Sequence, residues 1–162
     1  MSLFDLTFPL AAPFWALMIL APNWRWTERI MKSPWVPLLP LGCYFALVLP
    51  HFGEWGRAML RPDLGVLQAL LATPWGAGLV WAHLIAFDLF IARWMYFEGR
   101  ARGISPWLVS PILLLTIFLS PFGLVVFLVV QCLAGARPRT PAGSPPPDPG
   151  SGKVPGYAPS YE

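Results

Sequence analysis

Residues 81–94, WAHLIAFDLFIARW, decide how the rest of the sequence is interpreted. They place a histidine (His83), an aspartate (Asp88) and an arginine (Arg93) in a run that is otherwise apolar. An ionisable side chain at the centre of a bilayer costs about 2.5–3.5 kcal/mol on insertion scales. A membrane helix therefore carries such residues mainly where neighbouring helices shield them or where they have a function.

The composition predicts an integral membrane protein. Of the 162 residues, 56% are apolar and 12% are charged, whereas a soluble domain carries about 25% charged residues. Because the net charge is only +3 and no basic patch is visible, no nucleic-acid partner is expected. Cys43 and Cys132 each stand in an apolar run without a second ligand at metal-binding spacing, so neither a metal site nor a disulfide is predicted.

Four apolar stretches predict four transmembrane helices, at residues 6–21, 35–52, 75–94 and 107–133. A bilayer core requires about 20 apolar residues in a helix, so the first two stretches are short and the fourth is long. The fourth also contains the sequence SPFG at residues 120–123. It is therefore either one kinked span or two half-helices.

Hydroxyl–proline pairs mark the expected helix starts. A Ser or Thr can cap a helix while the following proline takes the first helical position, where its missing N–H costs nothing. These pairs predict the starts of spans two, three and four: Ser33-Pro34, Thr73-Pro74 and Ser105-Pro106.

The remaining segments complete the expected fold class, which is an all-α integral membrane protein. Residues 51–73 can place their leucines and Val66 on one face, which predicts a short interfacial helix, with a re-entrant hairpin as the alternative. Residues 1–134 would then form a four-transmembrane-helix bundle. Residues 135–162 are rich in Pro, Gly and Ser and predict a disordered C-terminal tail.

The Lys and Arg residues predict the orientation of the chain. They are concentrated in the first and third loops, which places those loops in the cytoplasm and both termini outside it. The N-terminal stretch lacks the basic region of a signal peptide and the Arg- and Ser-rich character of a transit peptide. We therefore expect a retained first span and a location in a bacterial plasma membrane.

The three polar residues of the third span predict a helix with several neighbours. His83 and Asp88 are five residues apart and so about 140° apart around a helix, because each residue turns it by about 100°. A neutral carboxylic acid and a neutral imidazole in a dry pocket would make a cofactor-free acid–base pair. Hydrogen bonding between helices is the alternative role. Haem ligation by His51 and His83 is disfavoured because their depths in the membrane match poorly.

The same stretch resembles a motif of the abscisic-acid-deficiency-four-like family, whose plant members are associated with neoxanthin synthesis. The motif is a histidine, then Phe-Asp-Leu-Phe, then a small residue and Arg-Trp, which here are His83, residues 87–90, Ala92 and residues 93–94. The later LSPFGLVVFLV, residues 119–129, is similar to the last span of the family, and LAPNWRWTERIMKSP, residues 20–34, matches less tightly.

The resemblance implies a small four-helix membrane protein that modifies xanthophylls. An epoxide end group would be isomerised to an allene without a cofactor, with Asp88 as acid, His83 as base and Arg93 orienting Asp88 or anchoring the helix. The expected partners are membrane lipid, a carotenoid or other polyene, and other membrane proteins. A non-catalytic subunit that binds pigment or scaffolds a membrane complex is the alternative.

Overall fold

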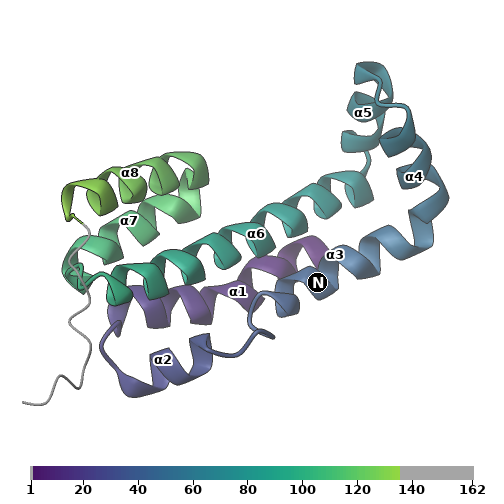
Figure 1. Ribbon diagram of the computed structural model, residues 1–162. Coiled ribbons are helices and arrows are strands. Elements are labelled where there is room, and N and C mark those ends of the chain that lie inside the picture. The colour runs from purple at the N-terminus through teal and green to yellow at the C-terminus, as the bar shows by residue number, and fades with distance from the viewer. Residues whose placement is uncertain (1, 136–162) are drawn as a thin grey trace, which may run out of the picture.

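The computed structural model describes residues 2–135, and these residues form helices without any strand. The all-α prediction is therefore confirmed for this part of the chain (Figure 1). The elements in order are α1 (Leu3–Leu20), α2 (Arg25–Met31), α3 (Leu38–Val48), the 3-10 turn η1 (Leu49–His51), α4 (Phe52–Leu60), α5 (Leu64–Leu71), α6 (Pro74–Ala101), α7 (Pro106–Phe118) and α8 (Ser120–Leu133). The predicted disordered tail lies outside the described residues, apart from its first position.

Helix α6 is the central element of the bundle. It contacts α1, α3, α5, α7 and α8, which confirms the prediction that the third apolar stretch has neighbours on several sides. Its inward positions carry Ala82, Leu89 and Ala92, all fully buried. The two alanines are small enough to allow neighbouring helices to approach closely. Figure 1 shows α6 running the length of the molecule, with α1 and α3 on one side and α7 and α8 on the other.

The outside of the bundle is apolar, which indicates association with a membrane. Two of the described helices, α1 and α6, are long and apolar enough to cross a bilayer. Large apolar side chains such as Phe87, Phe90 and Phe122 are more than half exposed. A monomeric soluble protein rarely exposes contiguous apolar surface of this extent.

Side-chain caps explain where the two long helices begin. At α1, the Ser2 hydroxyl accepts a hydrogen bond from the Asp5 N–H, and the Asp5 carboxylate accepts one from the Ser2 N–H. At α6, the Thr73 hydroxyl oxygen accepts a hydrogen bond from the Gly76 N–H at 3.1 Å. The predicted start at Thr73-Pro74 is thereby confirmed, as is the start of α7 after Ser105, although the Ser105 side chain makes no capping bond.

The second apolar stretch forms a shorter helix than predicted, because its proline-rich beginning is not helical. Residues 34–37 form a turn, in which the Ser33 hydroxyl accepts a hydrogen bond from the Trp35 N–H, and α3 begins only at Leu38. Prolines at 34, 37 and 40 remove three backbone donors, and a helix that began at Pro34 would carry Pro37 and Pro40 beyond its first turn, where proline is disfavoured. The predicted helix start at Ser33-Pro34 is therefore wrong.

The fourth apolar stretch forms two half-helices, one of the two alternatives that its sequence left open. Helix α7 ends at Phe118, Leu119 adopts a non-helical backbone conformation, and α8 packs back against α7 as a hairpin (Figure 1). A Cβ at Gly123 would overlap the Oγ1 of Thr116, so glycine is required where the two helices touch. Helices of 13 and 14 residues are about 20 Å long, too short to cross a bilayer core. The predicted bundle of four full spans is therefore not confirmed, and two of the described helices, α1 and α6, are long enough to cross.

Residues 51–73 form two short helices where one interfacial helix was expected. Helices α4 and α5 are separated by residues 61–63, where Pro62 interrupts the helix and the Asp63 carboxylate caps the α5 N-terminus through the Gly65 and Val66 N–H groups. Leu64, Val66 and Leu67 are exposed on α5. The location of these residues at a membrane interface stays a prediction.

The two ends of the described chain lie at opposite ends of the bundle. The Phe4 ring packs on Trp81, near the beginning of α6, with ring centroids 5.4 Å apart. At the other end, the Gln131 amide of α8 donates to the Glu98 carboxylate near the end of α6 at 3.0 Å. The sequence prediction placed both termini on one side of the membrane. The C-terminus lies outside the described residues, and the described chain ends at the opposite end of the bundle from Ser2 because the α7–α8 hairpin returns the chain to the end that it came from.

Candidate functional site

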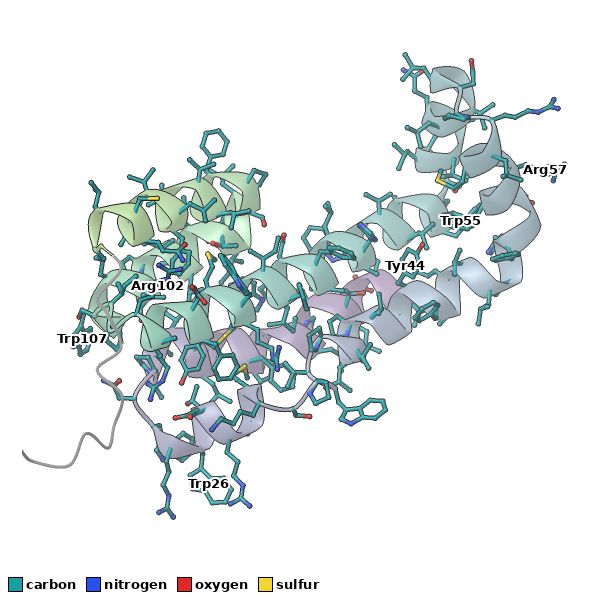
Figure 2. The ribbon with its side chains drawn as sticks, in the orientation of Figure 1. Trp26, Tyr44, Trp55, Arg57, Arg102 and Trp107 are labelled. Carbon is teal, nitrogen blue, oxygen red and sulfur yellow. The ribbon has the colours of Figure 1, made fainter. Side chains whose placement is uncertain are left out.

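The first candidate residue, His83, lies on the outer face of α6 in an aromatic setting. Its ring stacks on Phe87 one turn later, with centroids 4.5 Å apart, and lies 5.8 Å from the ring of Tyr44 on α3. Figure 2 labels Tyr44, which brings a phenol from α3 to this side of α6. His83 is exposed at the protein surface, so its imidazole is accessible to a molecule dissolved in the surrounding apolar phase.

An open groove continues from this aromatic cluster between the beginning of α3 and the middle of α6. Its volume is about 390 Å³, within the range that small-molecule sites occupy. Its lining is almost entirely apolar and consists of Pro34, Pro37, Leu38, Leu41, Ala86, Phe87 and Phe90. Phe87 belongs both to the groove and to the His83 stack, so an occupant of the groove would lie close to the imidazole.

The second candidate residue, Asp88, faces a different neighbour. Its half-buried carboxyl lies against the Ser120 hydroxyl at the tip of the α7–α8 hairpin. The first N–H groups of α8 have no side-chain cap, and an acidic group near a helix N-terminus is favoured by the helix dipole. Asp88 and His83 therefore point to opposite sides of α6, as their spacing of about 140° requires. The structure does not bring them together on one cavity.

The third candidate residue, Arg93, holds α2 rather than Asp88. Its guanidinium donates from Nε to the Met31 carbonyl at 2.5 Å and from Nη2 to the Lys32 carbonyl at 3.3 Å. These are the carbonyls that the end of a short helix leaves without partners, and a cation is favoured there. These contacts attach α2 to α6, which differs from both roles expected for Arg93, the orientation of Asp88 and the anchoring of its own helix.

Two residues that the sequence analysis did not single out complete this attachment. The Tyr96 hydroxyl donates to the Pro22 carbonyl at 2.9 Å, and Arg100 donates to the same oxygen at 3.2 Å. Arg100 also pairs with Glu28, which Lys32 contacts at 2.7 Å. The hydrogen bond and the positive charge of Lys32 hold the pKa of Glu28 below its ordinary value. Tyr96 and Arg100 follow Arg93 by three and seven residues, which places them on the same face of a helix, and this spacing is the only signal that could have revealed them.

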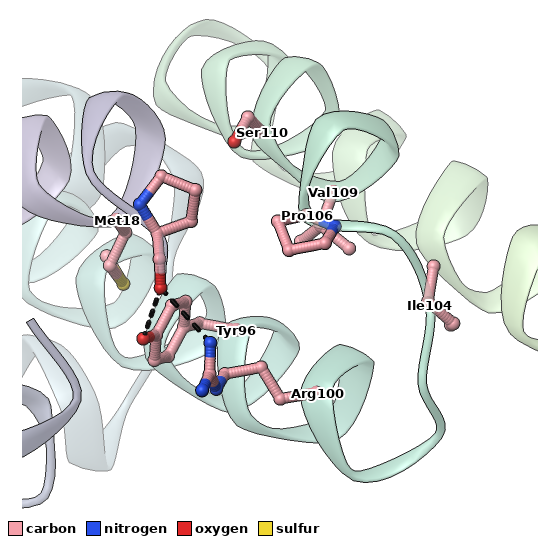
Figure 3. A pocket seen from close by; sticks show the side chains of 8 residues that line it. Met18, Tyr96, Arg100, Ile104, Pro106, Val109 and Ser110 are labelled. Carbon is pink, nitrogen blue, oxygen red and sulfur yellow. Dashed lines mark hydrogen bonds between the residues drawn. The ribbon is translucent and has the colours of Figure 1, made fainter. Parts of the chain in front are cut away.

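A small pocket lies beside this attachment, between α1, α6 and α7 (Figure 3). It is lined by Met18, Pro22, Tyr96, Arg100, Ile104, Pro106, Val109 and Ser110. Its volume of about 10 Å³ corresponds to space for about one water molecule. The buried Ser110 hydroxyl has no hydrogen-bond partner, and one water molecule would satisfy it. A polyene cannot enter a space of this size.

The described residues contain no group of three or more His, Cys, Asp and Glu side chains that could hold a metal ion. Cys43 is buried and Cys132 exposed, and both are free thiols. His51 stacks on Trp75 with centroids 4.2 Å apart, and its Nδ1 lies 3.1 Å from the Leu47 carbonyl oxygen. His83 is about 12 Å further along α6 than Trp75, at 1.5 Å per residue, so the two imidazoles have separate surroundings.

The comparison with known proteins agrees with the sequence motif. The model of the ABA4-like family, described as ABA DEFICIENT 4-like, matches residues 2–127. The chain belongs to this family. The protein ABA DEFICIENT 4, chloroplastic, of Arabidopsis thaliana is 28% identical over 102 residues, which cover 57% of this chain and 45% of that relative. The chain thus matches less than half of the relative's length. No solved structure matches the chain.

Family membership confirms the resemblance that the stretch around Asp88 indicated. The matched region ends at residue 127, within α8, so it includes α1 to α7 and most of the hairpin. It also contains the aromatic cluster, the groove and the α2 attachment. These features are therefore parts of the family domain and do not belong to the residues that follow it.

Proposed function

We propose that this protein acts on a carotenoid in a membrane and isomerises an epoxide end group of a xanthophyll to an allene. Membership of the ABA4-like family supports the substrate class, given the association of plant members with neoxanthin synthesis. The observation that carries the proposal is the open apolar groove between α3 and α6, whose lining includes Phe87, the residue on which the imidazole of His83 stacks. An apolar polyene can reach such a groove from the lipid phase.

The reaction is redox-neutral and requires two proton transfers. An acid donates a proton to the epoxide oxygen while the carbon–oxygen bond breaks. A base removes a proton from a polyene carbon, and the electrons of that bond form the second of the two adjacent double bonds. The two protein groups then exchange the proton, so no cofactor is consumed.

We assign the base to His83 and the acid to Tyr44, because their rings are neighbours and His83 stacks on Phe87, which lines the groove. Asp88 keeps a supporting role in this proposal, in which it holds the α7–α8 hairpin against α6. Arg93 likewise acts on α2. This assignment replaces the acid–base pair of Asp88 and His83 that the motif suggested, since those two side chains face different neighbours.

The test is expression in a host that accumulates an epoxide xanthophyll, followed by chromatography of the pigments. General acid–base catalysis contributes about 10²–10⁴-fold, so His83→Gln and Tyr44→Phe should each reduce the initial conversion rate by at least about 100-fold. Asp88→Asn should reduce conversion only in proportion to the loss of folded protein. Phe122→Leu, on the exposed face of α8, is the matched control.

Each outcome discriminates between the two functions that the sequence left open. Conversion by the wild type that His83→Gln abolishes supports the isomerase. Unchanged pigment that co-purifies with the wild type and is lost from a Leu41→Trp variant, which fills the groove, supports a pigment-binding subunit. Loss of conversion in Asp88→Asn with retained folding would return the acid to Asp88.

We also propose an orientation of the bundle in a bacterial plasma membrane. The end that carries α2 and the end of α6 holds most of the basic residues among those described, so the positive-inside rule places it in the cytoplasm. Gly135 would then be cytoplasmic and Ser2 outside. Labelling of cysteines introduced at these two positions in intact cells tests this arrangement.

A further inference from the structure

Helix α2 presents an outward surface of alternating indole and guanidinium groups that the proposed catalysis does not use. This α2 surface consists of Trp24, Arg25, Trp26 and Arg29, all exposed. The Arg29 guanidinium lies over the Trp26 ring, 5.5 Å from its centroid. Figure 2 shows Trp26 projecting away from the bundle. Trp26 is 43% exposed, so a large part of its indole faces away from the protein.

The α2 surface is held in a fixed position by the opposite side of the same helix. Met31 is fully buried, and the Thr27 hydroxyl, also buried, donates to the Ala21 carbonyl at 2.8 Å. Arg93 binds the carbonyls at the end of α2. The contacts described above for Tyr96 fix the loop that precedes it. The outward groups are therefore presented by an ordered element.

The charges of this region are balanced on the inner side and unbalanced on the outer side. Glu28 is the acidic residue of α2, and it pairs with Lys32 and with Arg100. The ion pairs formed among residues 2–135 include neither Arg25 nor Arg29. Two guanidinium groups on one face, four residues apart along the helix, thus remain available to an anion.

The depth of α2 along the bundle matches the headgroup layer of a bilayer. Helix α6 has 28 residues and is therefore about 42 Å long, whereas the hydrocarbon core is about 30 Å thick. If the first turn of α6 lies at one boundary of the hydrocarbon core, the last 12 Å or so of this helix, from Arg93 onward, extends beyond the other boundary. Arg93, Tyr96 and Arg100 all hold α2 within this segment.

We propose that the α2 surface binds the anionic headgroups of acidic phospholipids. Arginine binds phosphate oxygens through two parallel hydrogen bonds, and tryptophan prefers the headgroup level of the bilayer. The occupant is the lipid of the membrane in which the bundle lies, because the two indoles beside the arginines are suited to the boundary between acyl chains and headgroups.

The test measures the lipid that remains bound to the full chain. Protein in nanodiscs of phosphatidylcholine with one fifth phosphatidylglycerol is extracted gently, and the two lipids are quantified by mass spectrometry. The Arg25→Gln, Arg29→Gln double variant is compared with the wild type. The matched control is the Arg57→Gln, Arg61→Gln double variant, which removes the same charge from α4 at the other end of the bundle.

The wild type should retain phosphatidylglycerol in excess over its share of the bilayer. The α2 variant should lose this enrichment by about fivefold for each arginine, since a basic side chain near an anionic surface contributes about 1 kcal/mol. The control variant should retain it. The proposal fails if the α2 variant retains the wild-type ratio, or if both variants lose it equally, which would show a response to net charge alone. An unchanged melting temperature in a neutral detergent would show that the variants are folded.

Discussion

The change Gly123→Ala tests whether the fourth apolar stretch is a hairpin or one kinked span. In the hairpin, the added Cβ would overlap the Oγ1 of Thr116 and lie 2.9 Å from its Cα and 3.0 Å from its Cβ. Atoms of the α7 backbone cannot move aside without a shift of the whole helix. Overpacking of this kind costs about 1–3 kcal/mol. The variant should therefore be destabilised.

If the fourth apolar stretch were one continuous span, Gly123→Ala should raise the unfolding free energy instead of lowering it. Positions 116 and 123 would then be about 10.5 Å apart along one helix axis, and no clash would arise. Replacing glycine by alanine inside a helix would stabilise the protein by about 1 kcal/mol. The sign of the change in unfolding free energy thus separates the two arrangements.

The measurement is thermal unfolding in detergent, followed by far-ultraviolet circular dichroism. A change of 1 kcal/mol corresponds to about 2–8 °C in Tm for domains of this size, so Gly123→Ala should lower Tm by several degrees. Gly42→Ala, in α3, is the control, because a Cβ there meets nothing within 4 Å, and it should raise Tm slightly. A Tm for Gly123→Ala that rises as it does for Gly42→Ala would refute the hairpin.

The contacts around α6 lead to three further predictions. Arg93→Gln removes charge-assisted hydrogen bonds to two α2 carbonyls and should lower the unfolding free energy by about 1.5–3 kcal/mol, whereas Arg61→Gln should leave it unchanged in the same denaturation assay. Lys32 lowers the pKa of Glu28 in the folded state. The Glu28 carboxylate therefore contributes stability above the pKa that it has in the unfolded chain, and this contribution is lost as the pH falls through its pKa in the folded protein. Glu28→Gln should flatten the acid side of a curve of Tm against pH, and an unaltered curve would contradict the ion pair. Thr73→Val removes the cap of α6 and should cost about 1 kcal/mol, measured by the same thermal unfolding, while no loss would mean that the Gly76 N–H has found another acceptor.

The helical class and the central place of α6 could be predicted from local chemistry. Apolar runs specify helices in a membrane because backbone groups there must be satisfied within the segment. Thr73 and Pro74 marked the start of α6 because a cap and a proline act within one turn. The three polar residues on different faces indicated several neighbours, and α6 has them. The Ser33-Pro34 pair misled because the following prolines, Pro37 and Pro40, delay the helix.

The candidate site could be predicted only in part. The motif identified His83, and the family match supports its context. Tyr44 is 39 positions away in the sequence and gave no signal, since a ring that packs across two helices has no local pattern. Asp88 and Arg93 were correctly recognised as unusual. Their partners, the hairpin tip and the end of α2, depend on segments that are distant in the chain.

The sequence by itself determined that this protein is helical, that its outside is apolar and to which family it belongs. It also determined where prolines mark helix boundaries. Those properties depend on residue type and on spacing within one or two turns. Only the tertiary structure decided that the last apolar stretch folds back at Leu119, that His83 and Asp88 serve different neighbours, and that Arg93 binds α2. These outcomes depend on close packing between distant segments, such as Gly123 against Thr116, and packing energies of that kind exist only once the helices are together.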